Sequence, residues 1–587
     1  MKSLEDTLHP TDWSLVKKVL PFIGPYWHFY TVAIVLAPFS ALVAVLQPWL
    51  LQVAIDQHIL VGDVDGLQQV AIAFLVLALL SWILEAAYML ALANGAIRTI
   101  TLLRTHIYKH TIGLSRSFYD GQPVGRLMTR ATSDVEALGE TLTAGSVTIL
   151  LDILKVIGIL VAMMWLDFQL TLVLLLLAPL VLFIVEAIRR VLRRLYQEVR
   201  TSLSELNAFT AERFSGLKII QLYRDEARAI DMYVSRLFRY RRATIQTNIW
   251  DAALYAIMDG LRAITMALML WYGSGGLLDG VLSAGLLAAF IEYVDKLYRP
   301  IQEFSAKVAI LQRATSALEK IFGLLDVEER VVAGDVAMKS TDCDIRLEGL
   351  RFSYNDETEV LKGVSVRLKN GEVVALVGRT GSGKTTIGRL LSREYDGYTG
   401  SIRLNDVELS DIERSALRDL VQTVRQDAEL FNASVRFNLT LGRDVNDAAL
   451  WKGIEQAQAM EVVENLGGLD GQITQRGQNL SAGEMQLLSI ARVMVHEAPV
   501  VVLDEATANV DSLTEARIQR ATEALLSEKT VLVIAHRLST ITHANRIVLL
   551  DGGEVLEQGT HHDLIEQDGA YAALYQHQFA HDDIESP

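Results

Sequence analysis

The residues with the clearest chemistry form the segment GRTGSGKTT, which runs from Gly378 to Thr386 and follows the apolar run 373–377. This segment fits the pattern G-x-x-x-x-G-K-[ST] at every fixed position. In this pattern the glycines turn backbone N–H groups toward phosphates, Lys384 reaches the β- and γ-phosphates, and the Thr385 hydroxyl can bind Mg²⁺. The pattern therefore predicts a nucleoside triphosphate site made by Gly378, Arg379, Thr380, Gly381, Ser382, Gly383, Lys384, Thr385 and Thr386.

Other residues are candidates to complete this site from distant parts of the chain. A strand-like apolar run ends in Asp504 and Glu505, where Asp504 can hold Mg²⁺ and Glu505 can polarise the attacking water. Gln426 offers an amide to the metal or to water, and His536 can hydrogen-bond a γ-phosphate. Tyr354 is an aromatic residue of the kind that stacks on a purine ring. Each of these residues alone is more often structural than catalytic, but their joint order favours a hydrolytic site.

Length and composition place this site in a larger chain with a membrane part. The chain has 587 residues, of which 51% are hydrophobic, and its mean hydropathy is +0.27. These values exceed what a single soluble domain would have. The net charge of −16 argues against nucleic acid as a partner, because binding to its phosphates needs a basic surface. The single cysteine, Cys343, excludes a disulfide framework and a cysteine-rich metal site.

Apolar segments in the first half of the chain predict membrane-spanning helices. Residues 11–23 mix apolar and basic side chains and predict a short amphipathic helix on the cytoplasmic face. Six segments of roughly spanning length follow, near 29–53, 70–93, 147–166, 170–188, 252–272 and 281–298.

The distribution of basic residues predicts how these segments cross the membrane. Lys and Arg gather in the stretches 98–109, 189–194 and 236–242, whereas the loops on the opposite side carry neither. By the positive-inside rule we expect both termini to be cytoplasmic in an integral protein of the cytoplasmic membrane. The long cytoplasmic stretches keep helical periodicity and are broken at 117–123 and 215–216, where short helices could press on another domain.

Ionisable residues within or near the predicted spans have two interpretations. They can line a pathway for polar or cationic substrate groups, or they can pair with one another inside the helical bundle. We favour pairing for the residues spaced three or four apart, and Glu85 and Asp251 stay open. The pairs with this spacing are Asp152 with Lys155, Asp259 with Arg262, and Glu292 with Lys296. Asp295 directly precedes Lys296.

The predicted fold is multidomain, with an all-α domain of six transmembrane helices followed by an α/β P-loop domain. Short β runs begin at Ile345 and alternate with helices after Lys384, which is typical of an α/β nucleotide-binding domain. The expected limits are 1–27 for the amphipathic helix, 28–325 for the transmembrane domain, 326–344 for a linker, 345–580 for the nucleotide-binding domain and 581–587 for an acidic tail.

One further motif resembles the signature of a known family. Leu480 to Gln486 reads LSAGEMQ, which resembles the LSGGQ signature of ATP-binding cassette (ABC) proteins, and it precedes Asp504 and Glu505 as in that family. The phosphate loop, Gln426 and the stretches 508–511 and 535–537 extend this match over the second half of the chain. The six spans and residues 118–138 look like a type IV half-transporter exporter of the multidrug or lipid type.

The resemblance implies a mechanism that needs two chains. Two cassettes would close head to tail, so that the Ser481 hydroxyl and the Gly483 N–H contact the γ-phosphate of ATP held by the partner. It also implies that Tyr354 stacks on adenine, that Glu505 and His536 assist hydrolysis, and that the helices near 119–123 and 214–217 are coupling helices. ATP binding would turn the transport cavity outward, and hydrolysis would reset it.

The signature departs from the family pattern at Ala482, where glycine is usual, and at Glu484, where glutamine is usual. A methyl group crowds the approach of a phosphate, and a carboxylate near the nucleotide adds repulsion. Because Lys384, Gln426, Glu505 and His536 are all intact, this chain's own phosphate loop is expected to be competent beside a normal partner signature. We therefore favour one half of a heterodimer, and a homodimer that tolerates both substitutions is the alternative.

The function predicted from the sequence is ATP-driven export of amphipathic small molecules, drugs or lipids, by a dimer of half-transporters with ATP and Mg²⁺. Its expected partners are a second half-transporter, membrane lipid and the amphipathic substrate. One alternative is a peptide exporter half-transporter. An alternative of another class is a non-transporting, membrane-bound cassette regulator.

Overall fold

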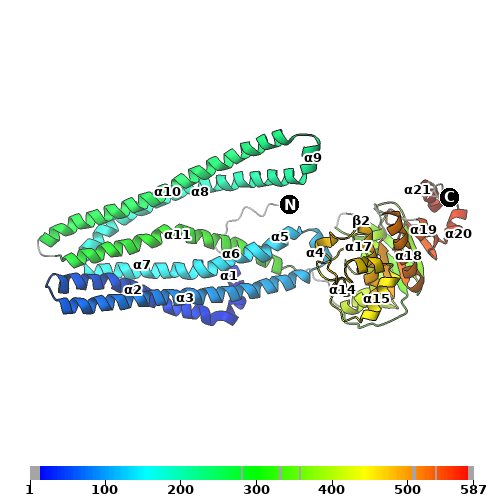
Figure 1. Ribbon diagram of the computed structural model, residues 1–587, viewed down its shortest axis with the longest axis horizontal. Helices are drawn as coiled ribbons and strands as arrows, with labels where there is room; N and C mark the ends of the chain where they lie inside the picture. The colour runs from blue at the N-terminus through cyan, green and yellow to red at the C-terminus, as the bar shows by residue number, and fades with distance from the viewer. Residues whose placement is uncertain are drawn as a thin grey trace. The chain divides into compact units, whose positions relative to one another are not determined.

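The computed structural model describes residues 13–278, 282–328, 334–355, 358–504, 511–535 and 538–578. The chain divides into two compact units (Figure 1). Unit 1 comprises Met1–Ile112 and Val124–Val327, and unit 2 comprises Gly113–Pro123 and Glu328–Pro587. The short segment 113–123 therefore belongs to unit 2, although helices of unit 1 flank it in the chain.

The regular elements of unit 1, among its described residues, are all helices (Figure 1). Its α-helices are α1 (Trp13–Ile23), α2 (Trp27–Val53), α3 (Val64–Ile112), α5 (Val124–Thr129), α6 (Val135–Glu140), α7 (Ser146–Leu166), α8 (Phe168–Ser215), α9 (Leu217–Leu222), α10 (Glu226–Leu278) and α11 (Ala284–Leu325). Shorter 3₁₀ or π turns lie between some of them: η1 (Gly24–Tyr26), η2 (Ala54–Ile59), η3 (Arg130–Asp134) and η4 (Thr141–Gly145).

Five helical stretches among the described residues are long and apolar enough to cross a membrane, namely Lys17–Ile59, Val64–Ile112, Val124–Leu166, Phe168–Ser215 and Glu226–Gly275. They hold the first five predicted spans. The sixth predicted span, 281–298, lies in α11 from Ala284 onward, and α11 is not among the five. The first half of α11 is interrupted by Glu292, Asp295, Lys296 and Arg299, which lower its apolar character.

Apolar side chains from α7, α8, α10 and α11 form the main core of unit 1. Met163, Met258 and Phe290 are essentially inaccessible to solvent. Tyr293 of α11 lies in the same core, where its hydroxyl donates to the carbonyl oxygen of Val45 in α2 at 2.7 Å. Such a hydroxyl needs a partner inside an apolar core, so this bond fixes α11 against α2.

The ionisable residues of unit 1 pair largely as predicted, with one correction. Glu292 and Lys296 form the expected pair at 3.2 Å, and Asp259 lies 3.8 Å from Arg262, which also pairs with Asp295. The prediction that Asp152 pairs with Lys155 is wrong, because Asp152 pairs with Lys307 of α11. Of the two residues left open, Asp251 accepts a hydrogen bond from Tyr196 at 2.5 Å.

Unit 2 contains two β-sheets. The first is antiparallel, with strand order β2-β1-β4-β5, and the second has the order β10-β9-β3-β8-β7-β6. In the second sheet β6, β7, β8, β3 and β9 run parallel, and β10 pairs antiparallel with β9. The strands are β1 (Ile345–Ser353), β2 (Glu359–Leu368), β3 (Val373–Val377), β4 (Thr399–Leu404), β5 (Val407–Glu408), β6 (Val421–Val424), β7 (Val500–Asp504), β8 (Thr530–Ile534), β9 (Arg546–Asp551) and β10 (Glu554–Gly559).

Helices surround these sheets (Figure 1). The α-helices of unit 2 are α4 (Arg116–Asp120), α12 (Lys384–Leu391), α13 (Arg414–Leu420), α14 (Val435–Thr440), α15 (Asp447–Gln456), α16 (Met460–Asn465), α17 (Ala482–Val495), α18 (Ser512–Glu528), α19 (Leu538–Thr542), α20 (His561–Glu566) and α21 (Ala570–Gln578), with 3₁₀ turns η5 (Leu409–Asp411) and η6 (Gln475–Gly477). The parallel strands are buried on both faces: β3 and β8 have no exposed residue. This pattern is typical of an α/β domain.

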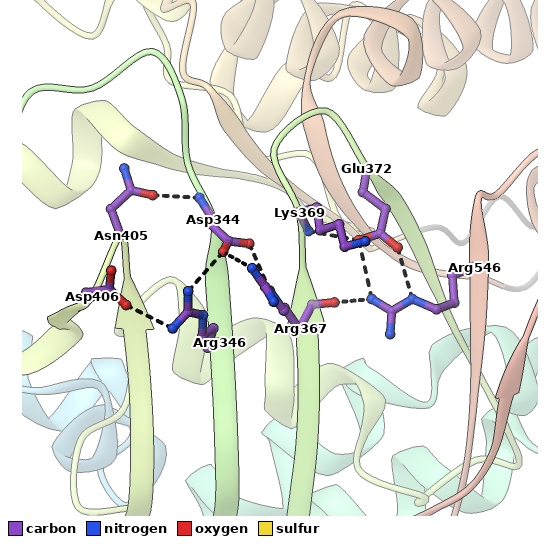
Figure 2. A network of polar contacts seen from close by, with 8 residues as sticks. All are labelled: Asp344, Arg346, Arg367, Lys369, Glu372, Asn405, Asp406 and Arg546. Carbon is purple, nitrogen blue, oxygen red and sulfur yellow. Dashed lines mark hydrogen bonds and ion pairs between the residues drawn. The ribbon is translucent and has the colours of Figure 1, made fainter.

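The end of the predicted linker is bonded to the sheets of unit 2. Figure 2 shows Asp344, whose carboxylate accepts from Arg367 at 2.8 Å and from Arg346 at 3.4 Å. The backbone N–H of Asp344 donates to Asn405 at 2.7 Å. The two guanidinium groups lower the pKa of Asp344 below its ordinary value, the Arg367 hydrogen bond being the main cause. These contacts hold the start of β1 against β2 and β4.

A second cluster in Figure 2 ties the two sheets together. Arg546 at the start of β9 donates through Nε to Glu372 at 2.9 Å, and its Nη2 donates to the carbonyl oxygen of Arg367 at the end of β2. The backbone N–H of Lys369 donates to the same Glu372 carboxylate at 2.8 Å. These residues lie at the amino-terminal ends of β3 and β9, opposite the edge where β3 leads into the phosphate loop.

Candidate functional site

The phosphate loop leaves β3 and enters α12 through glycines that no other residue could replace easily. Gly378 has φ +149°, and a Cβ there would lie 2.1 Å from the carbonyl oxygen of Leu550. Gly383 has φ +101°, and a Cβ there would lie 2.6 Å from a methyl group of Leu361. Both positions combine a positive φ with no room for a side chain, so the loop requires glycine. Gly383 starts α12 without a side-chain cap, which leaves the N-terminal N–H groups of α12 directed at the loop.

Polar groups converge inside this loop. Lys384 is buried, and its ammonium group donates to the carbonyl oxygens of Gly378 at 2.6 Å and Arg379 at 3.0 Å. Burial lowers the pKa of Lys384, and the nearby Asp504 carboxylate opposes this shift. The Ser382 hydroxyl is buried, and within the described residues it has no hydrogen-bond partner. A buried cation and an unsatisfied hydroxyl beside a helix N-terminus fit a bound phosphate group.

Tyr354 lies just past the end of β1 and beside α12. Its hydroxyl is 3.1 Å from the Thr386 hydroxyl and accepts from Arg389 at 3.4 Å. The ring packs edge-on against Phe352 and Tyr395, with centroid distances of 5.0 and 5.1 Å. At 44% exposed, Tyr354 keeps much of its surface accessible next to the helix that follows the phosphate loop. A ring held in this way is suited to stack on a base.

The order of the parallel strands brings the other candidates to the same edge as the phosphate loop. Strand β7 ends at Asp504, and Gln426 follows the end of β6, the neighbour of β7. Strand β8 lies between β3 and β7 and leads toward His536. In such sheets ligands bind at the carboxyl ends of the strands. Glu505, His536 and the stretch 508–510 of the family match lie outside the described residues, so their positions are known only from the sequence.

The signature segment begins α17 with a reciprocal cap. The Ser481 hydroxyl accepts from the Glu484 N–H at 3.3 Å, and the Glu484 carboxylate accepts from the Ser481 N–H at 2.7 Å. Ser481 and Ala482 are exposed, whereas Gly483 is buried. The Ser481 hydroxyl still has its own proton to donate, and the N–H groups of Ala482 and Gly483 are not used by this cap.

This role of Glu484 was not part of the sequence-based prediction, which considered only its charge. The spacing Ser481-x-x-Glu484 before an apolar helix is itself the signal of a capping box, so the sequence contained the information. Glutamine, the usual residue at this position, can make the same bond through its side-chain oxygen. The glutamate therefore preserves the local structure of the signature.

Comparison with known proteins agrees with these geometries. Residues 30–301 match the family "ABC transporter transmembrane region", and residues 361–508 match the family "ABC transporter". The chain is 32% identical to an ATP-dependent lipid A-core flippase of Chromohalobacter salexigens over 97% of this chain and 99% of that protein. It is 30% identical to a putative multidrug export ATP-binding/permease protein of Staphylococcus aureus (strain NCTC 8325 / PS 47) over 96% of this chain and 99% of that protein.

The phosphate loop, the parallel sheet and the apolar helices thus define a membrane-integral ATPase. The chain belongs to the ABC transporter family, as an exporter half-transporter, and its ATP hydrolysis is coupled to transport. An uncharacterized ABC transporter ATP-binding protein of Bacillus subtilis, YknV, is also 29% identical over 97% of this chain and 96% of that protein. ABC exporters function as dimers, so a second half-transporter is the expected partner.

Proposed function

We propose that this protein exports amphipathic small molecules, drugs or lipids, outward across the cytoplasmic membrane, with both termini on the cytoplasmic side. The observation that carries the proposal is the pairing of a phosphate loop with apolar helices along a chain that matches its relatives from end to end. Two of those relatives are named a lipid A-core flippase and a putative multidrug exporter. We infer an amphipathic substrate for this chain, because this class includes both lipids and many drugs.

In the proposed ATP site, different residues bind the adenine, the phosphates and the metal ion. Tyr354 stacks on adenine, while the backbone of 378–386 and the Lys384 ammonium hold the phosphates. The residues that would hold Mg²⁺ are Thr385, Gln426 and Asp504, which offer the oxygen ligands this ion prefers. The metal would neutralise charge on the phosphates.

In the proposed hydrolysis step Glu505 accepts a proton from the attacking water, and His536 donates a hydrogen bond to the γ-phosphate. The Ser481 hydroxyl and the Gly483 N–H of the signature contact the γ-phosphate bound to the partner chain. Closure of the two cassettes on ATP is favoured because the ligand makes contacts with both chains only in the closed state. We also propose the domain limits given above, with the cassette at 345–580.

For the dimer we propose one half of a heterodimer, with one competent and one impaired ATP site. Since Glu484 is engaged in the cap of α17, Ala482 is the substitution that would impair the site made by this signature. A homodimer would contain two such sites. Native mass and ATP turnover of this chain alone in lipid distinguish them: a two-chain particle with brisk hydrolysis means a homodimer, and turnover that needs a co-expressed half-transporter means a heterodimer.

Transport itself is tested in lipid vesicles that contain the purified dimer. We expect ATP-dependent movement of ethidium, an amphipathic cation, or of fluorescent phosphatidylethanolamine, and we expect Glu505→Gln to stop both movement and hydrolysis. Hydrolysis that Glu505→Gln leaves unchanged would contradict the assigned site. Full hydrolysis without movement of either probe would contradict export of an amphiphile and favour a regulatory role.

A further inference from the structure

The segment 113–123 is the part of unit 2 that the chain joins directly to α3 and α5 of unit 1. It contains the short helix α4, as predicted for the first break in the cytoplasmic helices. Leu114 and Phe118 are buried, at 3% and 8% exposed. Because Leu114 and Phe118 are buried while the two ends of the segment continue into helices of unit 1, a change in the surroundings of α4 has a direct covalent route to those helices.

A hydrogen bond joins the last residue of α4 to the cassette. The Tyr395 hydroxyl donates to Oδ2 of Asp120, and Arg116 Nε lies 3.3 Å from Oδ1 of the same carboxylate. Tyr395 is 6% exposed. Burial, reinforced by Asp120, raises the pKa of Tyr395 to about 12, so the hydroxyl keeps its proton and acts as the donor at neutral pH.

The other side of the same tyrosine touches the nucleotide site. The Tyr395 ring stands edge-on to Tyr354 at 5.1 Å, with an interplanar angle of 85°. The Tyr354 hydroxyl in turn contacts Thr386 and Arg389 of α12, the helix that starts at the phosphate loop. A base that stacks on Tyr354, or a shift of α12 as phosphate binds, therefore changes the packing around Tyr395.

We propose that the Tyr395–Asp120 hydrogen bond is the positioning contact by which the nucleotide at Tyr354 and α12 controls α4, and that it couples ATP binding to substrate movement. Tyr395 touches neither nucleotide nor transported substrate in this proposal and acts through Tyr354 and Asp120. Only the coupling to substrate movement rests on the proposed transport function. The response of α4 to nucleotide does not depend on which substrate is carried.

The hydroxyl can be removed without the ring. In the full-length dimer in lipid, Tyr395→Phe keeps the edge-on contact with Tyr354, so we expect hydrolysis without substrate to stay within about twofold of wild type. We expect ethidium-stimulated hydrolysis and ethidium transport to fall about tenfold, because a coupling free energy of about 1.4 kcal/mol is lost with a bond of ordinary strength.

The matched control is Tyr398→Phe. Tyr398 lies three residues away, is partly buried, and its hydroxyl donates to Glu408 at 3.2 Å, a residue outside segment 113–123. It should lose a comparable hydrogen bond without any loss of coupling. Equal loss of coupling in Tyr398→Phe and Tyr395→Phe would assign the effect to general destabilisation and overturn the proposal.

The partner residue provides a double-mutant cycle. Asp120→Asn keeps an acceptor oxygen and should retain most of the coupling, whereas Asp120→Ala should behave like Tyr395→Phe. The double variant Tyr395→Phe with Asp120→Ala should be no worse than either single variant, since both remove the same bond. Additive losses, or full coupling in Tyr395→Phe, would contradict the proposal.

Amide hydrogen exchange separates this inference from the proposed function. ATP should increase the protection of residues 113–123 in the wild-type dimer, and Tyr395→Phe should abolish that change while ATP still protects the phosphate loop. If neither ethidium nor fluorescent phosphatidylethanolamine is moved but this nucleotide response is present and needs Tyr395, the proposed function fails and the contact stands. If the wild-type segment does not respond to ATP, or responds equally in Tyr395→Phe, the contact is structural only.

Discussion

The phosphate loop and the signature segment both present backbone N–H groups at the start of an α-helix, yet the two helices begin in opposite ways. Helix α12 begins at Gly383 without any side-chain cap, whereas α17 begins at Ser481 with a complete capping box. In the first case the N–H groups at the helix start have no side-chain acceptor. In the second, the helix satisfies one of these N–H groups with its own serine and adds a glutamate that bonds the serine backbone.

This difference fits two different tasks. A loop that must surround phosphates needs its donors uncommitted, and the buried Lys384 adds a charge where the ligand binds. A segment that reaches a ligand on another chain must keep its shape before that ligand arrives, so rigidity at Ser481 lowers the cost of binding. The loop is therefore expected to determine affinity for ATP, and the signature is expected to affect turnover.

The largest expected effect tests the loop side of this comparison. Lys384→Ala should weaken ATP binding at this chain's own site by about 100-fold or more, since contacts of a cation to two phosphates each contribute about 1.5–3 kcal/mol. A fluorescent ATP analogue titrated into the purified protein measures this. Lys369→Ala, at the opposite end of β3, is the control and should bind ATP with wild-type affinity. Wild-type affinity in Lys384→Ala would mean that the phosphate loop is not part of the ATP site.

On the signature side, Ser481→Ala removes both the cap and the hydroxyl that would face the partner's phosphate. We expect turnover to fall about tenfold with ATP affinity nearly unchanged, because a donor to developing charge lowers the barrier and contributes little to ground-state binding. Steady-state kinetics at varied ATP separate kcat from KM. A change in KM alone would mean that the signature, like the loop, acts on binding.

Two substitutions of Glu484 distinguish its role in the helix cap from the effect of its negative charge. Glu484→Gln keeps the acceptor for the Ser481 N–H and should leave turnover within about twofold, whereas Glu484→Ala loses a cap that is worth about 1 kcal/mol and should lower turnover about fivefold. The pair of variants is measured side by side in the same dimer. A rise in turnover on Glu484→Gln would instead indicate that the carboxylate repels the nucleotide.

Ala482 is the remaining departure from the family pattern. If its methyl group crowds the partner's phosphate, Ala482→Gly should raise turnover about two- to threefold at the site made by this signature, even though glycine costs a helix about 1 kcal/mol relative to alanine. Hydrolysis by the dimer, with and without a partner that carries an inactive phosphate loop, assigns the gain to one site. No gain at that site would favour a homodimer with two competent signatures.

The smallest effect on ATP chemistry is expected at Asp344, which precedes β1 and bonds Arg367 and Arg346 rather than a residue of the ATP site. Its pKa is depressed from 3.8 in the folded protein, mainly by Arg367, so its contribution to stability is present above pH 3.8 and is lost as the pH falls through the lower folded value. Asp344→Asn should lower stability by about 0.5–1 kcal/mol at pH 7, since Arg367 is half exposed, and leave ATP affinity unchanged.

Thermal unfolding of the detergent-solubilised protein at pH 7 and at pH values below 3.8 measures this difference. The gap between wild type and Asp344→Asn should narrow as the pH falls, because the wild-type carboxyl then loses its charge as well. Asp406→Asn is the control: Asp406 is exposed and accepts a hydrogen bond from Arg346 at 2.9 Å, so its substitution should change stability little. A gap that stays constant with pH would mean that the Arg367 pair does not stabilise the fold.

Local patterns in the sequence determined much of this protein. The spacing of glycines, Lys384 and Thr385 predicted the loop between β3 and α12, and runs of apolar residues predicted the long helices. Such features follow from the backbone conformation and burial of neighbouring residues, so they can be recognised in a short stretch of chain. The capping box of Ser481 and Glu484 is also a local pattern of this kind, although the prediction from the sequence used only the charge of Glu484.

Only the tertiary structure decided which distant residues meet. The spacing of Asp152 and Lys155 suggested a pair on one helix, but Asp152 bonds Lys307, 155 positions away. Tyr395 and Asp120, 275 positions apart, meet because segment 113–123 packs with unit 2. Both contacts depend on which helix faces pack together and on the order of strands in a sheet. Neither contact is encoded in the spacing of residues along one element, because an α-helix satisfies its own backbone hydrogen bonds whatever packs against it.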